Sequence, residues 1–132
     1  MMSAGKQVLV ADDGLMGSRL GEHLATSQVT VVTVTDGLQA LRALHNRHFD
    51  AVITDQHLPY FDGLDLLGQC RLVWPELPVI ILSFRLFEVM GQARAKGAYA
   101  CLLKPVDTET LLHVLSEAMA CSPSTLETAR MT

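Results

Sequence analysis

The sequence predicts a single α/β domain built on a five-stranded parallel β-sheet with helices on both faces. Short, almost wholly apolar segments of strand length alternate with longer segments whose apolar residues recur at helical spacing. Strands buried on both faces are typically continuous apolar runs, as these are. The chain has 132 residues, of which 49% are hydrophobic and 5% aromatic, and this suits one domain with an aliphatic core.

The first half of the chain is expected to hold three strands and two helices. Apolar runs predict strands at Gln7–Ala11, Thr30–Val34 and Ala51–Thr54. Between the first two strands, Leu15–Thr26 places apolar residues on one helical face. Before the third strand, Asp36 is the expected N-cap of a second helix. The apolar positions of that helix are Leu38, Ala40, Leu41 and Leu44.

The second half continues the same alternation. Gly63 opens a helix rich in leucine, which ends before the proline-containing segment that starts at Pro75. Val79–Leu82 is the fourth strand. A helix follows over Phe87–Lys96, and Gly97 stands at the position where a glycine often terminates a helix.

Ala100–Leu103 is the fifth strand, and Asp107 or Thr108 caps the last helix. Five strands alternating with five helices, joined by right-handed crossovers, favour the flavodoxin-like strand order 2-1-3-4-5. We assign residues 6–120 to this domain. Residues 121–132 are interpreted as a flexible tail or the start of a linker.

Composition excludes several classes of function. The net charge of −4, without a basic stripe, argues against direct binding of nucleic acid. The three cysteines Cys70, Cys101 and Cys121 show no CxxC spacing, which favours a reducing, cytoplasmic setting over a disulfide framework. The segment Met1–Lys6 lacks the apolar stretch of a signal peptide, and no apolar run is long enough to span a membrane.

Charged residues follow three of the expected strands. Asp12-Asp13 follows the first strand, Asp55 the third and Lys104 the fifth. The carboxyl ends of parallel strands face one crevice, so these side chains are expected to meet there. Crowded carboxylates need a cation between them, and Mg²⁺ (or Mn²⁺) beside a lysine suits the handling of a phosphoryl group. Taken alone, Asp12-Asp13 is also typical of a turn or of an N-cap for the first helix.

Together, these residues resemble the receiver domain of bacterial two-component response regulators, as in the chemotaxis response regulator. The resemblance covers roughly residues 6–120 and rests on five elements in order. They are Asp12-Asp13, Asp55, the loop Leu58-Pro59-x-x-Asp62-Gly63, the hydroxyl of Ser83, and Lys104-Pro105.

The resemblance implies a role for each of these residues. Asp55 would be the phosphoacceptor, taking a phosphoryl group from the phosphohistidine of a histidine kinase or a phosphotransfer protein. Asp13 and Asp55 would bind Mg²⁺ directly, Asp12 mostly through water, and the backbone carbonyl of His57 would complete the protein ligands. Lys104 would pair with Asp55 and then with the phosphoryl oxygens. Such a domain phosphorylates and dephosphorylates itself and is a signalling domain more than a turnover enzyme.

The resemblance also implies a switch. The Ser83 hydroxyl would move to the phosphoryl group, and the face formed by the fourth helix, fifth strand and fifth helix would repack. That face would then bind a downstream protein or an output domain outside this chain. By analogy with the family alone, it would also permit a homodimer.

Three positions depart from the family pattern. The residue three before the lysine is usually aromatic but is Cys101 here, and strand alternation is expected to point Tyr99 to the same side. The residue after the hydroxyl is usually small but is Phe84 here. The two positions that tune phosphoryl lifetime are His57, whose imidazole is expected to face solvent, and Arg85. Phe84 either fills the space of the missing aromatic residue or shields the site and slows phosphoryl entry and loss.

Three other functions are possible for a chain of this fold class. A phosphatase of the haloacid dehalogenase type would carry an Asp-x-Asp motif, whose second acid acts as general acid and base. Here Gln56-His57 follows Asp55, so that second acid is absent. An FMN site would need a Ser/Thr/Gly-rich phosphate loop after the first strand, where Asp12-Asp13 stands. The serious alternative is a pseudo-receiver or adaptor that binds partners without phosphorylation, and Phe84 and Cys101 favour it.

Overall fold

The protein folds around one parallel five-stranded sheet, which we describe from a computed structural model covering residues 5–12, 14–24 and 28–120. The strands pair in the order β2-β1-β3-β4-β5, all parallel, as the sequence predicts. Their bounds are β1 Lys6–Ala11, β2 Val29–Val34, β3 Ala51–Asp55, β4 Val79–Ser83 and β5 Ala100–Leu103.

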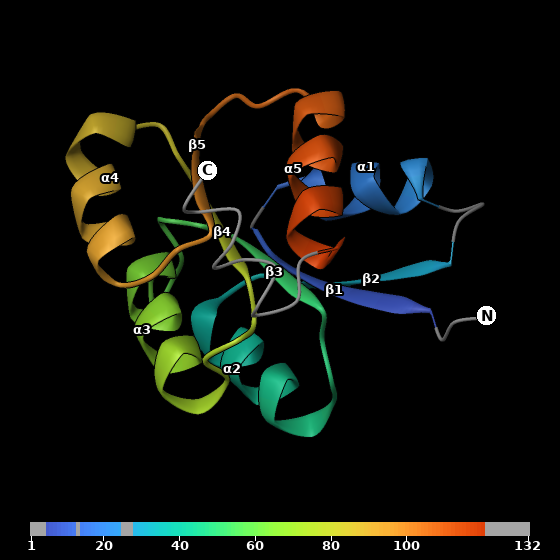
Figure 1. The fold of residues 1–132 in the computed structure, drawn as a ribbon, viewed down its shortest axis with the longest axis horizontal. Helices are drawn as coiled ribbons and strands as arrows, with labels where there is room; N and C mark the ends of the chain where they lie inside the picture. The colour runs from blue at the N-terminus through green and yellow to red at the C-terminus, as the bar shows by residue number, and fades with distance from the viewer. Residues whose placement is uncertain (1–4, 13, 25–27, 121–132) are drawn as a thin grey trace.

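Five helices cover the two faces of the sheet. Figure 1 shows α1 and α5 on one side, and α2 and α3 on the other with α4 beside them. Their bounds are α1 Met16–His23, α2 Gly37–Asn46, α3 Gly63–Val73, α4 Leu86–Ala95 and α5 Thr108–Ala120. Among the helices formed by the described residues, we find none with the length and hydropathy needed to cross a membrane.

Alternating residues of the central strands supply two separate cores. Leu9, Val52 and Ile81 belong to the cluster that packs under α2, α3 and α4. Val8, Ile53 and Leu82 belong to the cluster under α1 and α5. All of β3 and β4 is buried, as expected for strands covered on both faces. Burial on both faces of the sheet therefore explains the apolar runs of the sequence. The same packing holds in place the strands whose carboxyl ends carry the site.

Local side-chain chemistry sets the helix ends. Asp36 accepts a hydrogen bond from the backbone N–H of Gln39 at 2.8 Å, so the predicted cap of α2 is confirmed. Asp107 caps α5 by accepting from the backbone N–H of Thr110, also at 2.8 Å, which settles the choice between Asp107 and Thr108. Gly97 has a φ of +92° and follows the C-cap of α4. It was predicted for this position because glycine adopts the left-handed conformation without strain.

The first helix is shorter than predicted. It begins at Met16, with Leu15 at the N-cap position, and the Asp12 side chain accepts a hydrogen bond from the Met16 backbone N–H at 3.2 Å. Leu15 consequently lies outside the helix and is 67% exposed instead of packing on the core. The helix ends at His23, and the remainder of the expected range reaches residues 25–27, which lie outside the described residues. The predicted tail at residues 121–132 also lies outside them.

Two glycines let the loop after β3 pass close to neighbouring backbone. A Cβ atom on Gly63 would lie 2.4 Å from the Asp55 carbonyl oxygen, and one on Gly37 would lie 1.8 Å from that of Phe61. The Gly63 backbone N–H donates to the Gln56 carbonyl at 2.9 Å. The start of α3 is thereby held directly against the end of β3, where Asp55 stands.

We predict that Gly63→Ala destabilises the fold, because its Cβ atom has no space against the Asp55 backbone. The expected cost is roughly 1–3 kcal/mol in the free energy of unfolding, measured by urea denaturation. Gly91→Ala is the matched control, since nothing lies within 4 Å of a Cβ atom at that position in α4. It should stabilise by up to about 1 kcal/mol, because alanine favours the helix over glycine. Equal effects of the two substitutions would contradict this account of the loop.

Candidate functional site

The carboxyl end of β3 carries a buried carboxylate paired with a lysine. Asp55 is the last residue of β3, and its Oδ1 lies 2.7 Å from the Nζ of Lys104. The two side chains are 6% and 22% exposed respectively, so the pair is largely removed from water. The strand ladder brings Lys104 there, since its backbone N–H donates to the Ser83 carbonyl at 2.9 Å, just past the end of β5. The predicted meeting of Asp55 and Lys104 is therefore present.

Asp12 joins this pair from the end of β1. Its carboxylate caps α1 at Met16 and also contacts the carboxyl group of Asp55. Burial, and then the hydrogen bond with Asp12, raise the pKa of Asp55 to about 7, although Lys104 acts in the opposite direction. Burial alone would raise the pKa of Asp12, but the hydrogen bonds from Asp55 and from the Met16 backbone lower it. The single lysine does not neutralise two adjacent carboxylates. At neutral pH, Asp12 and Asp55 therefore either share a proton or need another cation.

The two carboxylates fit a hard divalent cation. Mg²⁺ prefers oxygen ligands from one or two carboxylates together with water. Within the described part of the chain, no three His, Cys, Asp or Glu side chains come together as a metal site. Asp13, predicted as a further ligand, lies outside the described residues. Of the predicted ligands, Asp12, Asp55 and His57 lie within the described residues, and the carboxyl groups of Asp12 and Asp55 are in contact. A cation beside them would oppose the burial and the contact with Asp12 that raise the pKa of Asp55.

Ser83 and Arg85 stand at the end of β4. Ser83 is buried, and its hydroxyl oxygen accepts a hydrogen bond from the Arg85 backbone N–H at 2.9 Å. The hydroxyl therefore holds the turn into α4. The Arg85 guanidinium lies 3.5 Å from a carboxylate oxygen of Glu88, and both side chains are exposed. This surface pair shows an interaction of Arg85 with α4 that the sequence did not suggest.

Phe84 lies over Lys104. Its ring centroid is 4.9 Å from the lysine Nζ, and the residue is 66% exposed. The ring therefore lies at the surface and is not packed in the interior, and its use of the space of the missing aromatic residue stays a prediction. The alternative, that it shields the site, agrees with the contact. Sequence reasoning missed the partner of the ring, although the register that pairs β4 with β5 could have indicated it.

The side chains near β5 differ from the expectation in one respect. Cys101 is half-buried against the cluster under α2, α3 and α4, and burial raises the pKa of its thiol. Tyr99 instead packs against the cluster under α1 and α5. The prediction that both point to the same side is wrong, because Tyr99 precedes β5 and strand alternation does not apply to it. His57 is exposed, as expected for its imidazole.

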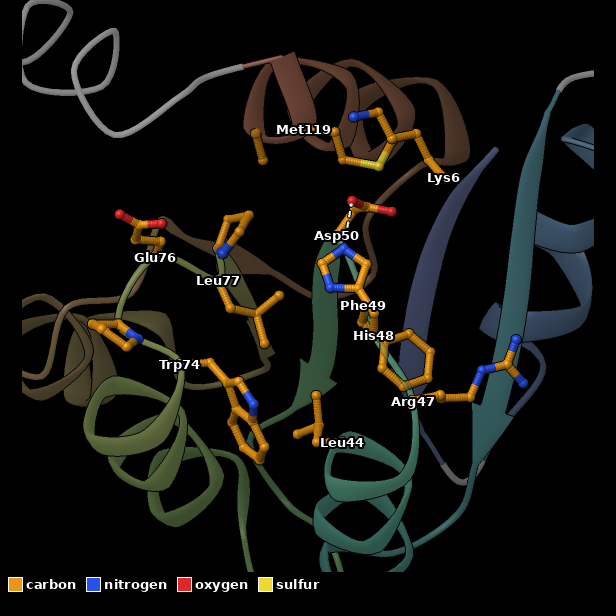
Figure 2. A pocket seen from close by; sticks show the side chains of 13 residues that line it. Lys6, Leu44, Arg47, His48, Phe49, Asp50, Trp74, Glu76, Leu77 and Met119 are labelled. Carbon is orange, nitrogen blue, oxygen red and sulfur yellow. Dashed lines mark hydrogen bonds and ion pairs between the residues drawn. The ribbon is translucent and has the colours of Figure 1, made fainter. Parts of the chain in front are cut away.

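A pocket of about 440 Å³ lies at the opposite end of the sheet. Figure 2 shows its apolar wall, which includes Trp74, Leu77 and Met119, with His48 and Asp50 beside it. The Asp50 carboxylate already has hydrogen-bond partners, since it contacts the His48 ring at 3.1 Å and accepts from the Gln7 backbone N–H at 2.7 Å. This acid joins the starts of β1 and β3 and is structural. The residues predicted from the sequence to carry chemistry lie at the other end.

Comparison with known sequences identifies relatives along nearly the whole domain. A family model of the response regulator receiver domain matches residues 8–116. The chain is 34% identical over 122 residues to the transcriptional regulatory protein GlrR of Escherichia coli strain K12, covering 91% of this chain and 28% of the relative. It is 31% identical over 120 residues to the DNA-binding transcriptional regulator NtrC of the same strain, covering 90% and 26%. The chain therefore spans about a quarter of the length of these curated relatives.

Solved structures show the same fold. The signal receiver domain of an HD domain-containing protein from Pseudomonas fluorescens Pf-5 is similar with a TM-score of 0.82 and 29% identity, covering 91% of this chain and 90% of that one. The chemotaxis response regulator CheY4 of Vibrio cholerae is similar with a TM-score of 0.79 and 27% identity, covering 86% and 98%.

The raised pKa of Asp55 predicts how stability depends on pH in the metal-free protein. The folded state holds the Asp55 proton up to about pH 7, whereas the ordinary pKa of the group is 3.8. Asp55 therefore contributes stability that is fully present below pH 3.8 and is lost as pH rises towards 7. Relative to Asp55→Asn, the wild type should lose at most about 1.4 kcal/mol per pH unit across this window.

The measurement is urea denaturation of both proteins in a metal chelator between pH 4 and pH 8. The comparison with Asp55→Asn removes the contribution of titrating groups that the two proteins share, and Asp107, whose pKa is lowered from 3.8, affects stability only below this pH range. A stability difference that does not change with pH would contradict the raised pKa of Asp55, and with it the effect of burial and of the contact with Asp12.

Proposed function

The chain belongs to the response regulator receiver domain family of two-component signalling, and from that membership we propose that Asp55 accepts a phosphoryl group. The donor would be the phosphohistidine of a histidine kinase or of a phosphotransfer protein. The observation that carries the proposal is the buried Asp55 carboxylate, held 2.7 Å from Lys104 and in contact with Asp12.

The proposed transfer uses groups that the structure places together. An oxygen of the Asp55 carboxylate forms a bond to phosphorus while the P–N bond of the donor breaks. The electron pair of that bond returns to the imidazole nitrogen of the donor histidine. Lys104 is already 2.7 Å from Asp55 and can follow the charge onto the phosphoryl oxygens as a flexible cation. Positioning and charge neutralisation are the main requirements of phosphoryl transfer.

Asp12 and Asp55 would hold Mg²⁺ (or Mn²⁺), together with Asp13 and the backbone carbonyl of His57 by the family pattern. When bound, the ion would neutralise the two carboxylates and the charge that develops on the phosphoryl group. Oxygen ligands of this kind suit Mg²⁺. Asp12 would continue to accept the hydrogen bond from the Met16 backbone N–H while it also binds the ion.

A phosphoryl group at Asp55 would be read out through the loop after β4. Ser83 would exchange its present hydrogen bond with the Arg85 N–H for one to the phosphoryl oxygens, and α4 would shift with it. Such a shift is a change in population between two states. A downstream protein, an output domain or a second copy of the chain would recognise the surface of α4, β5 and α5.

A second function has a specific observation in its favour. The Phe84 ring lies 4.9 Å from Lys104 and covers the cation that the phosphoryl group would meet. If this contact closed the site altogether, the domain would be an adaptor that docks partners without phosphorylation. Uptake of phosphoryl at Asp55 distinguishes the two functions.

We expect the protein to gain one phosphoryl group when acetyl phosphate and Mg²⁺ are added together, measured by intact mass. Asp55→Asn should gain none, and neither should the wild type in a metal chelator. Asp36→Asn is the matched control, because asparagine also caps a helix and Asp36 serves α2 and not the site. It should be phosphorylated as the wild type is. A folded protein that gains no phosphoryl group would favour the adaptor.

We also expect Mg²⁺ to raise the melting temperature of the wild type more at pH 7.5 than at pH 5. The ion competes with the proton for Asp55, whose pKa is raised to about 7, so protonation at the lower pH weakens binding. Thermal unfolding with and without Mg²⁺ at both pH values measures the difference. In Asp55→Asn the shift at pH 7.5 should be smaller. Shifts of equal size in the two proteins would count against Asp55 as a ligand.

A further inference from the structure

We propose that the ring of Phe84 shields Lys104, so that it slows both phosphoryl uptake from small donors and hydrolysis of the phosphorylated site. The proposal rests on the proposed function of Asp55. It assigns to Phe84 a positioning role that acts through the lysine. The observation that carries it is the 4.9 Å contact between the ring centroid and Nζ, at the nitrogen that also pairs with Asp55.

The sheet fixes this contact from both sides. Ser83 pairs with Leu103 in the register of β4 and β5, so Phe84 and Lys104 are the next residues along two neighbouring strands. The Lys104 backbone N–H donates to the Ser83 carbonyl at 2.9 Å, and the Ser83 hydroxyl accepts from the Arg85 N–H at 2.9 Å. The residues on either side of Phe84 are therefore held by hydrogen bonds, and the ring is presented to the lysine by the backbone.

Core packing does not account for the ring. Phe84 is 66% exposed and belongs to neither buried cluster. The Lys104 side chain is only 22% exposed, although its ammonium group is charged. A cation over an aromatic face is attracted by the ring quadrupole, and this attraction is stronger where water is partly excluded. The ring therefore has a partner in Lys104 and reduces the access of water to it.

The chemical consequence follows from the two contacts of Nζ. Phosphoryl oxygens that pair with Lys104 must share the ammonium group with the ring or displace it. In hydrolysis, a water oxygen bonds to phosphorus while the bond from phosphorus to the Asp55 oxygen breaks. The electron pair returns to the carboxylate, inorganic phosphate leaves, and a proton passes to solvent. A ring that limits water at the lysine slows this step and also slows the entry of a small donor.

Three substitutions of Phe84 separate the effect of its aromatic ring from that of its bulk. Phe84→Ala removes both, Phe84→Leu keeps an apolar side chain without the ring, and Phe84→Tyr keeps the ring. Phe87→Ala is the matched control, because Phe87 is an exposed aromatic residue of α4, 89% exposed. Each protein is phosphorylated with acetyl phosphate and Mg²⁺. The donor is then removed, and loss of the phosphoryl group is followed by intact mass.

We expect Phe84→Ala and Phe84→Leu to take up and lose the phosphoryl group about two- to fivefold faster than the wild type. Phe84→Tyr should restore the slow rates, and Phe87→Ala should keep them. Unchanged rates in Phe84→Ala would overturn the proposal. So would wild-type rates in Phe84→Leu, because they would show that bulk suffices without the ring. Equal acceleration by Phe87→Ala would also overturn it, since the effect would not depend on contact with Lys104.

A second measurement does not depend on phosphorylation. Acetic anhydride modifies accessible amines, and peptide mass gives the rate at Lys104 relative to the exposed Lys6 and Lys96 in the same sample. This relative rate should rise severalfold in Phe84→Ala and Phe84→Leu but not in Phe84→Tyr. If no variant accepts a phosphoryl group while the amine rates behave as expected, the function proposed for Asp55 fails and the shield stands. Unchanged amine rates would overturn the shield even in a protein that is phosphorylated.

Discussion

The site depends on one electrostatic constraint, the contact of the buried Asp55 carboxylate with the half-buried Asp12 carboxylate beside a single lysine. Asp55 ends a strand whose five residues are all buried, and Asp12 reaches it from the neighbouring strand. Lys104 compensates one charge at 2.7 Å, which leaves the other without a cation among the described residues. Removing one charged side chain from such a group leaves the others unpaired where little water can solvate them. The sheet order, the loop glycines and the helix caps all act to hold these three side chains together.

Topology is the reason that residues so far apart in the sequence meet. Asp12 and Lys104 come from opposite halves of the chain, and parallel strands joined by helical crossovers bring all their carboxyl ends to one edge. The same crossovers place α1 at Asp12 and α4 after Ser83. Asp12 therefore links the acidic site to the start of α1, and the Ser83 hydroxyl links the end of β4 to the start of α4. A change of charge at Asp55 therefore occurs close to the starts of both α1 and α4. It can affect these helices directly, without being transmitted through distant residues.

Much of this arrangement could be predicted from the sequence because its signals are local and strong. Apolar runs located the strands to within one or two residues, Asp36 and Gly97 marked helix ends, and the order of Asp12, Asp55 and Lys104 indicated the site. The errors arose where tertiary contacts decide. Helical spacing placed Leu15 on a buried face, but the helix starts one residue later and Leu15 is exposed. Tyr99 does not follow the strand alternation because it lies just before β5. The contact of Phe84 with Lys104 was not predicted because it depends on the register between β4 and β5.

The two ends of the sheet show why unmatched charge, more than volume, marks a functional site. At the amino end, a pocket of about 440 Å³ lies beside Asp50, whose oxygens already meet His48 and the Gln7 backbone N–H. Folding has satisfied that acid, and it stabilises the strand starts. At the carboxyl end, the pKa of Asp55 is raised to about 7 because burial and Asp12 oppose its charge. The fold keeps this unfavourable charge at the end of a fully buried strand, where a cation or a phosphoryl group can relieve it. Carboxyl groups with perturbed pKa values concentrate at functional sites.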